Sequence, residues 1–328
     1  MILSWQNQAW ENLTTRRAQL PHALLLAGKP GLGKSGLAQT FAQGLLCTVQ
    51  QATGLPCGNC QACGWFSLGN HPDYRLIQPD SMAPETEDER GKDKKKSNQI
   101  RIEQIRELET FLSVGTHRGG LRIILVDPAD TMNTVTQNAL LKSLEEPPPA
   151  SLFLLVTSRP QRLLATIRSR CQLLHVSAPP AELAEVWLTE QGVANPAAAL
   201  AAAAGAPLAA LSAADWEKPQ HEFLSRLQEP RIDPLWLADM CNSLDPALVV
   251  NWLQRWVYDL LQLQAAGTVR YHRTLQVAME RIAAQANPGA LCNLLRRLAQ
   301  ARALASHPLN PRLFFEHIFL EYQSAVGS

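Results

Sequence analysis

Residues 22–46 contain the pattern that most restricts how this chain can fold: a short apolar run, a glycine-rich loop and a helix in immediate succession. The apolar run is His22–Ala27, the loop Gly28–Ser35 fits G-x-x-x-x-G-K-[ST], and helical spacing of apolar residues covers Ser35–Leu46. Such a loop curls so that successive backbone N–H groups face phosphate oxygens, and the start of the helix adds positive charge. The sequence therefore predicts a buried strand, a phosphate-binding loop and a helix.

The side chains of this loop have expected roles toward a nucleotide. Gly28, Gly31 and Gly33 let the backbone approach the phosphates. Lys34 is expected to reach the β- and γ-phosphates, and Ser35 is expected to hold Mg²⁺. The alternative, a glycine-rich turn without a ligand, stays open at this point.

A second apolar run, Leu121–Val126, is followed by Asp127, an acid at the end of a predicted buried strand. In P-loop ATPases this aspartate coordinates Mg²⁺. A glutamate that polarises the attacking water usually follows, but the next residue here is Pro128, which carries no base. Asp130 is the nearest other carboxylate, and we expect its side chain to point elsewhere. A strand that merely ends at a polar residue is the alternative to a magnesium ligand.

Four of the seven cysteines are clustered with the spacing C-x9-C-x2-C-x2-C. Four thiolates at this spacing can bind one Zn²⁺ tetrahedrally and leave no open position, so the expected site is structural. The candidate ligands are Cys47, Cys57, Cys60 and Cys63, and His71 is a competing ligand. Cys171, Cys241 and Cys292 are expected to be core or surface thiols. A cysteine cluster without a disulfide framework indicates a reduced, cytoplasmic protein.

The first 180 residues alternate short apolar runs with amphipathic stretches, which predicts a parallel sheet with helices on both faces. The further strands are expected at Tyr74–Ile77, Leu152–Val156 and Leu173–Val176. After Pro179–Pro180 the pattern is helical to the end of the sequence. We therefore expect an α/β P-loop domain over residues 1–178, a helical lid domain over 179–214 and an all-α domain over 215–328.

Two features of the helical and charged segments give further expectations. Trp236, Trp252 and Trp256 are at positions that suit buried helix faces. Pro79–Gln99 is rich in charge and poor in apolar residues, so it is interpreted as a mobile loop. Its basic run Lys94–Lys96 can touch DNA, but a solvated loop is the favoured interpretation.

The composition excludes some classes of protein. A hydrophobic content of 46% in 328 residues is ample for two or three domains. The net charge of +1 gives no global electrostatic case for binding nucleic acid. The chain has no apolar run of the roughly 20 residues that a membrane helix needs, and its first ten residues do not fit a secretory signal.

Taken together, these segments resemble the clamp-loader branch of the AAA+ ATPases. The resemblance is strong over roughly the first 180 residues, and Asn310–Pro311 is similar to the end of the collar domain of that family. The motifs that carry it are Pro21–Leu24, the phosphate loop, the four cysteines, Gly69–Asp73, Gln137–Pro148 and Ser169–Cys171.

The resemblance implies a part in DNA replication, as a subunit of a DNA polymerase III clamp loader. That complex is a ring of five subunits, which include gamma or tau motor subunits and a delta subunit. It loads the sliding clamp on primed DNA. The third domain would be the oligomerising collar. Ser158 follows the strand where the family places a polar sensor, beside Thr157. Arg170 would complete the ATP site of a neighbouring motor subunit as an arginine finger, although from the residues alone a surface salt bridge is the default interpretation.

Two kinds of subunit in this family carry the cysteines and the Ser-Arg-Cys motif: the motor and a stationary subunit. This sequence departs from the motor at Pro128 and at Leu208, where the motor supplies a nucleotide-sensing arginine. The intact phosphate loop implies binding of ATP or ADP with Mg²⁺ without appreciable hydrolysis. An active motor subunit is one alternative. A zinc-bearing, nucleotide-dependent scaffold unrelated to replication is the other.

Overall fold

The computed structural model describes residues 2–15, 17–49, 51–83, 97–113, 120–214, 216–229, 232–305 and 310–327. The chain divides into two compact units, Met1–Leu211 and Ser212–Ser328, and each is described by itself. Most of the predicted charged loop, residues 84–96 with Lys94–Lys96, lies outside the described residues.

The first unit is built on a five-stranded sheet in the order β2-β3-β4-β1-β5, and every described pairing is parallel. The apolar runs predicted the strands because strands buried on both faces are apolar throughout. The observed bounds differ from the expected ones by no more than one residue: β1 Ala23–Ala27, β2 Tyr74–Ile77, β3 Arg122–Val126, β4 Ser151–Thr157 and β5 Gln172–His175. The predicted parallel sheet is confirmed.

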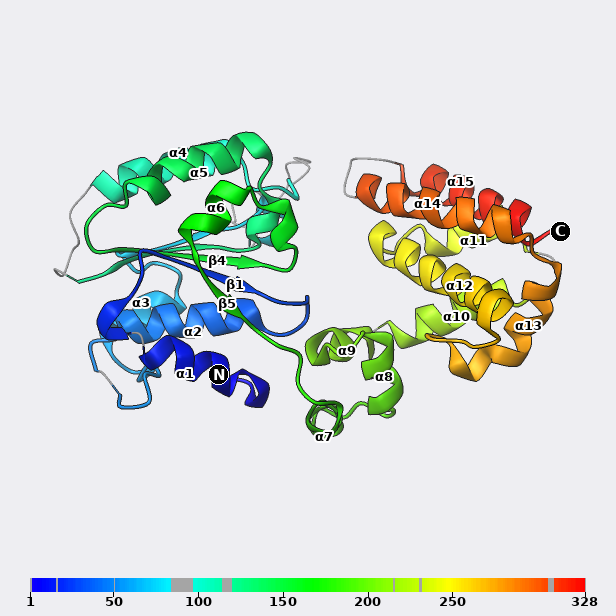
Figure 1. Ribbon diagram of the computed structural model, residues 1–328, viewed down its shortest axis with the longest axis horizontal. Helices are drawn as coiled ribbons and strands as arrows, with labels where there is room; N and C mark the ends of the chain where they lie inside the picture. The colour runs from blue at the N-terminus through cyan, green and yellow to red at the C-terminus, as the bar shows by residue number, and fades with distance from the viewer. Residues whose placement is uncertain are drawn as a thin grey trace. The chain divides into compact units, whose positions relative to one another are not determined.

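Helices cover both faces of this sheet, as Figure 1 shows. Alternate strand residues serve the two layers: Leu24 and Leu26 pack in one core cluster, and Leu25 packs in the other. The first layer contains α1 (Asn7–Thr15), α2 (Lys34–Leu46) and α3 (Gln61–Ser67), and the second contains α4 (Ile102–Ser113), α5 (Thr134–Glu145) and α6 (Ala165–Arg170). The predicted α/β domain with helices on both faces is therefore confirmed.

Three short helices follow the sheet, and they have a small core of their own. They are α7 (Ala181–Glu190), α8 (Pro196–Ala202) and α9 (Pro207–Ala214). Ala184, Leu188, Leu200 and Ala210 pack together between them. The separate lid domain stays a prediction, because these helices form one compact unit with the sheet. The described 3₁₀ helices are η1 (Ser4–Gln6), η2 (Arg17–Gln19), η3 (Asp80–Met82), η5 (Ala129–Thr131), η6 (Pro160–Arg162) and, in the second unit, η7 (Arg273–Leu275).

The second unit is helical throughout its described part. Its helices are α10 (Glu217–Leu227), α11 (Pro234–Cys241), α12 (Pro246–Ala266), α13 (Gln276–Gln285), α14 (Pro288–Leu304) and α15 (Pro311–Val326). Four of them begin with an Asp or Asn cap followed by proline, which satisfies free backbone N–H groups and fixes the first turn. The caps are Asp233, Asp245, Asn287 and Asn310. None of the helices in the described part of the chain is long and apolar enough to cross a membrane.

Tryptophans hold the core of the second unit, but one of the three predicted core positions was wrong. Trp252 and Trp256 are buried, and Trp256 Nε1 donates a 2.7 Å hydrogen bond to the Tyr322 hydroxyl. Trp236 is 43% exposed. On α11 the neighbouring Leu237 and Ala238 take the inward positions, so the ring of Trp236 faces solvent under the Arg226 guanidinium, 4.4 Å away.

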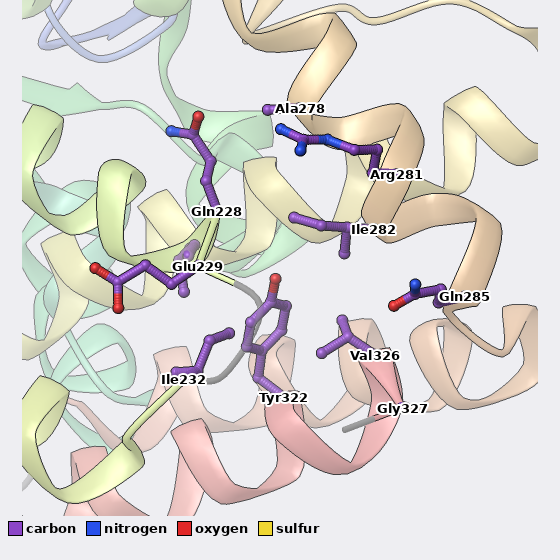
Figure 2. Close-up of a pocket in the computed structure, with 11 residues that line it drawn as sticks. Gln228, Glu229, Ile232, Ala278, Arg281, Ile282, Gln285, Tyr322, Val326 and Gly327 are labelled. Carbon is purple, nitrogen blue, oxygen red and sulfur yellow. The ribbon is translucent and has the colours of Figure 1, made fainter.

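A pocket of about 160 Å³ opens beside Tyr322, at the ends of α10, α13 and α15. Figure 2 shows Tyr322, Ile282 and Val326 near its centre, with the polar side chains of Arg281 and Gln285 at its margin. Since Tyr322 also belongs to the helical core, the apolar floor of the pocket is continuous with that core.

A buried carboxylate fixes the segment between α12 and α13. Asp259 on α12 is fully buried and accepts hydrogen bonds from the backbone N–H groups of Arg270, Tyr271 and His272. The His272 ring lies 2.9 Å from its second oxygen. Burial acts to raise the pKa of Asp259, but the hydrogen bonds from His272 and the backbone outweigh it, and the pKa is lower than usual.

Replacing Asp259 with asparagine should destabilise the second unit by about 2–3 kcal/mol, because buried N–H donors lose a charged acceptor. A carboxylate with a lowered pKa stabilises the fold at neutral pH, and this contribution is lost as the pH falls through the folded-state pKa. The difference in unfolding free energy between Asp259→Asn and the unmodified chain should therefore shrink as the pH falls below 3.8, the ordinary pKa of an aspartate.

Urea unfolding followed by tryptophan fluorescence at pH 7 and at acidic pH measures both effects. Asp245→Asn is the matched control, because asparagine also caps a helix and Asp245 is exposed. Equal stability of Asp259→Asn and the control at pH 7 would contradict this account.

Candidate functional site

The predicted phosphate loop lies between the carboxyl end of β1 and the start of α2. Gly31 and Gly33 have φ values of +75° and +77°, a region that favours glycine, and Gly33 caps α2. Lys34 is buried, and its Nζ donates hydrogen bonds to the Lys29 carbonyl at 2.7 Å and to Ser158 Oγ at 2.9 Å. The structure thus brings Lys34 and Ser158, two of the predicted site residues, into direct contact.

The predicted magnesium ligands lie next to this lysine. Asp127, at the end of β3, is buried and accepts a hydrogen bond from the Ser35 side chain. Burial raises the pKa of Asp127, whereas Ser35 and the nearby Lys34 lower it and Asp130 raises it. Burial also lowers the pKa of Lys34, and the two aspartates act against this effect. The Lys34 ammonium group and the Asp127 carboxylate are therefore both poorly solvated, and Asp130 lies near enough to act on both.

Asp130 belongs to this cluster, and the expectation that it points elsewhere was wrong. Its Oδ1 accepts hydrogen bonds from Thr157 Oγ1 at 2.8 Å and from the Ser158 N–H at 3.1 Å. Asp130 lies in the 3₁₀ turn η5, which directs its side chain toward the end of β4. The spacing between Asp127 and Asp130 in the sequence did not indicate this turn. The available signal for it was an acidic residue two positions after Pro128.

The two departures from a motor subunit occupy the same region. Pro128 follows Asp127 directly and provides no proton acceptor at the position where a general base is expected. Leu208, near the start of α9, donates its backbone N–H to the Gly31 carbonyl at 3.1 Å. An aliphatic side chain, in place of a cationic one, thus lies beside the phosphate loop. The arrangement offers groups that can hold phosphate and Mg²⁺, but no base at position 128.

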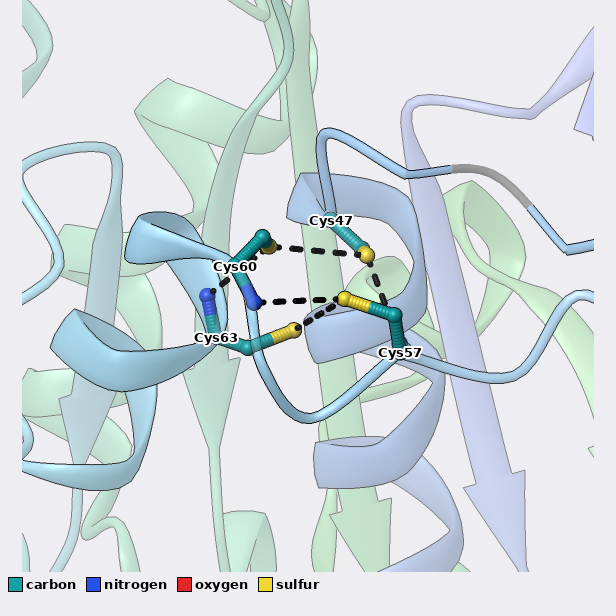
Figure 3. Close-up of side chains that lie close together, drawn as sticks. All are labelled: Cys47, Cys57, Cys60 and Cys63. Atoms are coloured by element: carbon teal, nitrogen blue, oxygen red, sulfur yellow. Dashed lines mark hydrogen bonds between the residues drawn. The ribbon is translucent and has the colours of Figure 1, made fainter.

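The four clustered cysteines meet as predicted from their spacing, as Figure 3 shows. Their four Sγ atoms lie within 4.8 Å of one another. Cys47 Sγ is 3.8 Å from Cys60 Sγ, and Cys57 Sγ is 4.0 Å from Cys63 Sγ. Sulfurs bound tetrahedrally at 2.3 Å from Zn²⁺ lie about 3.8 Å apart, so the geometry fits such an ion. The cysteines can therefore hold a metal.

Local hydrogen bonds favour a thiolate at Cys60, whereas burial raises the pKa of Cys63 to about 12. The backbone N–H groups of Cys57, Cys60 and Cys63 each point at the sulfur of another cysteine. Hydrogen bonds, first from Thr48 and then from the Cys63 N–H, lower the pKa of Cys60 to about 5. His71 is not part of the four-sulfur group, since its Nδ1 accepts a hydrogen bond from the Asp73 N–H.

The three remaining cysteines are core or surface thiols, as expected. Cys171 and Cys241 are buried, and burial raises the pKa of each to about 12. Cys292 is exposed on α14. All seven cysteines are free thiols.

Arg170 ends α6 and lies at the surface of the first unit. It forms an ion pair with Glu145 at 2.7 Å and donates to the Thr166 carbonyl at 3.0 Å, and its side chain is 35% exposed. Glu145 ends α5 and belongs to the motif Gln137–Pro148. The default interpretation, a surface salt bridge, is thus observed within the chain, and the guanidinium still has contact with solvent.

Gln137, at the other end of that motif, fixes the segment that leads to Arg170. Its side-chain amide donates to the Arg162 carbonyl at 3.1 Å and accepts from the Leu164 N–H at 2.7 Å. Gln137 is buried, and α6 begins directly after Leu164. The motif Gln137–Pro148 therefore contacts α6 and its N-terminal cap through residues at both ends of that helix.

Sequence models of two related domain families match the chain. The model described as DNA polymerase III, delta subunit, matches residues 5–180, and that described as DNA polymerase III, delta subunit, C terminal, matches residues 215–324. These matches cover both compact units.

Individual proteins are similar over nearly the whole chain. DNA polymerase III subunit delta' of Pseudomonas aeruginosa is 32% identical over 99% of this chain and 98% of its own length. The Escherichia coli protein of the same name is 32% identical over 87% of this chain and 79% of its length. A solved gamma-subunit-related protein of Thermotoga maritima is 16% identical, with a TM-score of 0.42, over 97% of this chain and 99% of that chain.

Similarity to motor subunits is confined to part of the chain. DNA polymerase III subunit tau/gamma of Haemophilus influenzae is 36% identical, but over only 49% of this chain and 21% of its own length. The motor alternative is therefore not favoured, and neither is a scaffold unrelated to replication.

Replacing Cys60 with serine should abolish stoichiometric binding of a divalent metal, because one of the four thiolates is lost. Cobalt(II) is a suitable probe, since its absorption reports tetrahedral thiolate ligands, and metal content can be measured directly. Cys292→Ser is the matched control, because this exposed cysteine lies outside the cluster. Full metal content in Cys60→Ser would rule out the four-cysteine site.

Proposed function

The chain belongs to the family of DNA polymerase III delta subunits, and relatives similar over most of its length are named subunit delta'. From this premise we propose that it is a clamp-loader subunit that helps to place the sliding clamp on primed DNA. Its proposed contribution is to complete an ATP site on a neighbouring subunit, while its own site binds nucleotide without appreciable hydrolysis. The activity of the larger holoenzyme, DNA-directed DNA polymerase, would belong to other subunits.

The observation that carries this proposal is the composition of the Lys34 site. Lys34 and Ser158 would contact the terminal phosphate, and Ser35 and Asp127 would hold Mg²⁺. Gly28, Gly31 and Gly33 would let the loop follow the phosphates. Pro128 cannot accept a proton from water. Since hydrolysis needs an oriented and activated water molecule, the site is suited to binding ATP or ADP and not to turnover.

Arg170 is the residue proposed to act on the neighbouring subunit. Its guanidinium is partly exposed, and its partner Glu145 is itself 48% exposed. An ion pair between exposed side chains contributes about 0–1 kcal/mol, so a phosphate can readily replace the carboxylate. The planar guanidinium can then donate to phosphate oxygens as negative charge develops on them.

The cysteine cluster is proposed to hold a structural Zn²⁺. Four thiolates leave no open coordination position for a substrate, and their separations suit this ion. The chemistry supplied by the ion is then structural: it would join the loop after Cys47 to the start of α3. Free thiols of this kind persist in a reducing compartment, in agreement with a place in the cytoplasm.

The proposed partners follow from the family. The named relatives are subunits of DNA polymerase III, and gamma, tau and delta subunits are the expected neighbours in the ring. The all-α unit is the proposed collar, and the three predicted domains 1–178, 179–214 and 215–328 are retained as a proposal. Contact with the sliding clamp and with primed DNA would be indirect or weak, because the net charge is only +1.

Arg170→Ala should lower the DNA-stimulated ATPase activity of a reconstituted loader at least several-fold, because one ATP site loses its charge-stabilising arginine. The assembly itself should still form. Arg170→Lys should not restore the activity, since lysine lacks the planar fork.

Arg168→Ala is the matched control, because Arg168 is exposed on the same helix and should be neutral. Steady-state phosphate release and size-exclusion chromatography give the two readouts. An unchanged ATPase rate in an assembled Arg170→Ala loader would sink the trans-acting role.

A further inference from the structure

The segment Leu3–Thr15, named here the N-terminal strap, contacts the phosphate loop directly. It contains η1 and α1. Gln6 is buried, and its Nε2 donates to the Leu32 carbonyl at 2.8 Å and to the Gly33 carbonyl at 2.9 Å. Trp5 Nε1 adds a hydrogen bond to the Leu32 carbonyl at 3.2 Å. No motif in the sequence pointed to this contact.

These bonds fix the direction of the loop amides. In a trans peptide unit the C=O of one residue and the N–H of the next point in opposite directions. Holding the Leu32 carbonyl toward the strap therefore turns the Gly33 N–H away from the strap. Backbone N–H groups are the groups with which such a loop binds phosphate, so Gln6 sets the orientation of one of them.

The strap and the loop are also in close contact. A methyl group at Gly33 would lie 2.6 Å from Gln6 Nε2 and 2.8 Å from Leu3 Cδ1. Both distances are shorter than ordinary contacts, so the side chains of Gln6 and Leu3 pack closely against Gly33. A small shift of the strap would therefore displace the loop or open a gap beside it.

The other end of the strap contacts the loop between the first two metal-site cysteines. Trp10 Nε1 donates to the Thr53 carbonyl at 3.0 Å. A methyl group at Gly54 would lie 2.6 Å from Thr14 Cγ2. Thr53 and Gly54 lie between Cys47 and Cys57, so a metal that joins these cysteines would hold the strap's contact surface in place.

Helix α2 runs between the same two sites. Its first residue is Lys34, and its C-terminal cap is Cys47. Trp10 of the strap also packs edge-on against Phe41 of α2, with ring centroids 6.1 Å apart. The metal site and the phosphate loop are thus joined by two adjacent helices, and the strap contacts the Leu32 and Gly33 carbonyls through side chains that can be changed singly.

We propose that Gln6 is a positioning residue for the phosphate loop and that the metal at the four cysteines acts on Gln6 through Trp10, so that metal occupancy raises the affinity for nucleotide. The proposal rests on the nucleotide and metal sites proposed above. Its substrate class is a nucleoside di- or triphosphate with Mg²⁺.

Gln6→Ala should weaken binding of MgADP to the full chain by about tenfold, the effect of losing hydrogen bonds worth about 1.4 kcal/mol. Metal content should stay unchanged. Gln8→Ala is the matched control, because Gln8 is exposed on the same strap and should leave both quantities unchanged. Isothermal titration calorimetry and metal analysis measure them. Equal affinities of Gln6→Ala and Gln8→Ala would overturn the positioning role.

Removing the metal with a chelator tests the second step. MgADP affinity should fall several-fold in the unmodified chain but not further in Gln6→Ala, because both changes act through one contact. Trp10→Phe keeps an aromatic ring, although a smaller one, but loses the N–H donor, so it should reduce the effect of the chelator. Trp236→Phe is the control, because Trp236 lies in the second unit and its replacement should leave the effect of the chelator unchanged. An affinity that is independent of metal in the folded chain would overturn the coupling.

Hydrogen exchange without nucleotide separates this proposal from the proposed function. Amides of residues 31–34 should exchange faster after metal removal and in Gln6→Ala, while those of β3 and β4 stay protected. If the unmodified chain binds no MgADP, the proposed nucleotide site fails, and the exchange result alone decides the positioning role. Unchanged exchange at residues 31–34, with or without metal, would overturn it.

Discussion

The burial of the Lys34 ammonium group near Asp127 and Asp130 is the constraint on which the rest of this site depends. An ammonium group can be buried only when opposite charges and hydrogen bonds compensate it, and Asp127, Asp130, Ser158 and the Lys29 carbonyl provide them. Two carboxylates face one ammonium group, so a polyphosphate can enter only with added cations. Mg²⁺ is therefore part of the nucleotide binding proposed for this site.

The same cluster is the basis for the proposal that this chain binds nucleotide without hydrolysing it. Holding phosphate needs the loop N–H groups, Lys34 and a metal ligand, all of which are contributed by the ends of parallel strands and by α2. Hydrolysis needs one more group at position 128, where the chain has proline. Because phosphate binding and hydrolysis depend on different residues, the group needed for hydrolysis can be lost without disturbing the fold. The partly exposed Arg170 is then the residue proposed to act on a neighbour.

Much of the first unit could be predicted from sequence because its three central strands, β1, β3 and β4, are buried on both faces. Continuous apolar runs such as Leu152–Val156 mark these strands with little ambiguity. The cysteine spacing gave the four-sulfur cluster for a similar reason, since short loops leave few alternatives. Helix faces were less certain: Trp236 follows the helical pattern but lies one residue away from the buried side of α11. Periodicity alone does not settle such a one-residue difference.

The contacts that sequence did not reveal are those made through turns and backbone carbonyls. Asp130 reaches the site because η5 turns it toward β4, and Gln6 reaches Leu32 across 26 residues. Neither contact leaves a motif, because a carbonyl acceptor is present at every residue and any amide can donate to it. The ion pair of Arg170 with Glu145 is comparable, since both residues lie in recognised motifs but their pairing depends on how α5 and α6 pack.

The central claim is that this chain holds ATP without cleaving it, and the fate of bound ATP tests that claim most directly. Purified chain would be mixed with a substoichiometric amount of γ-labelled ATP and Mg²⁺, with Lys34→Ala as the control for site-specific binding. The account predicts that the label is retained as intact ATP over hours in the unmodified chain and is not retained by Lys34→Ala. Release of labelled phosphate at a rate on the order of 1 s⁻¹, the low end for a working enzyme, would contradict it.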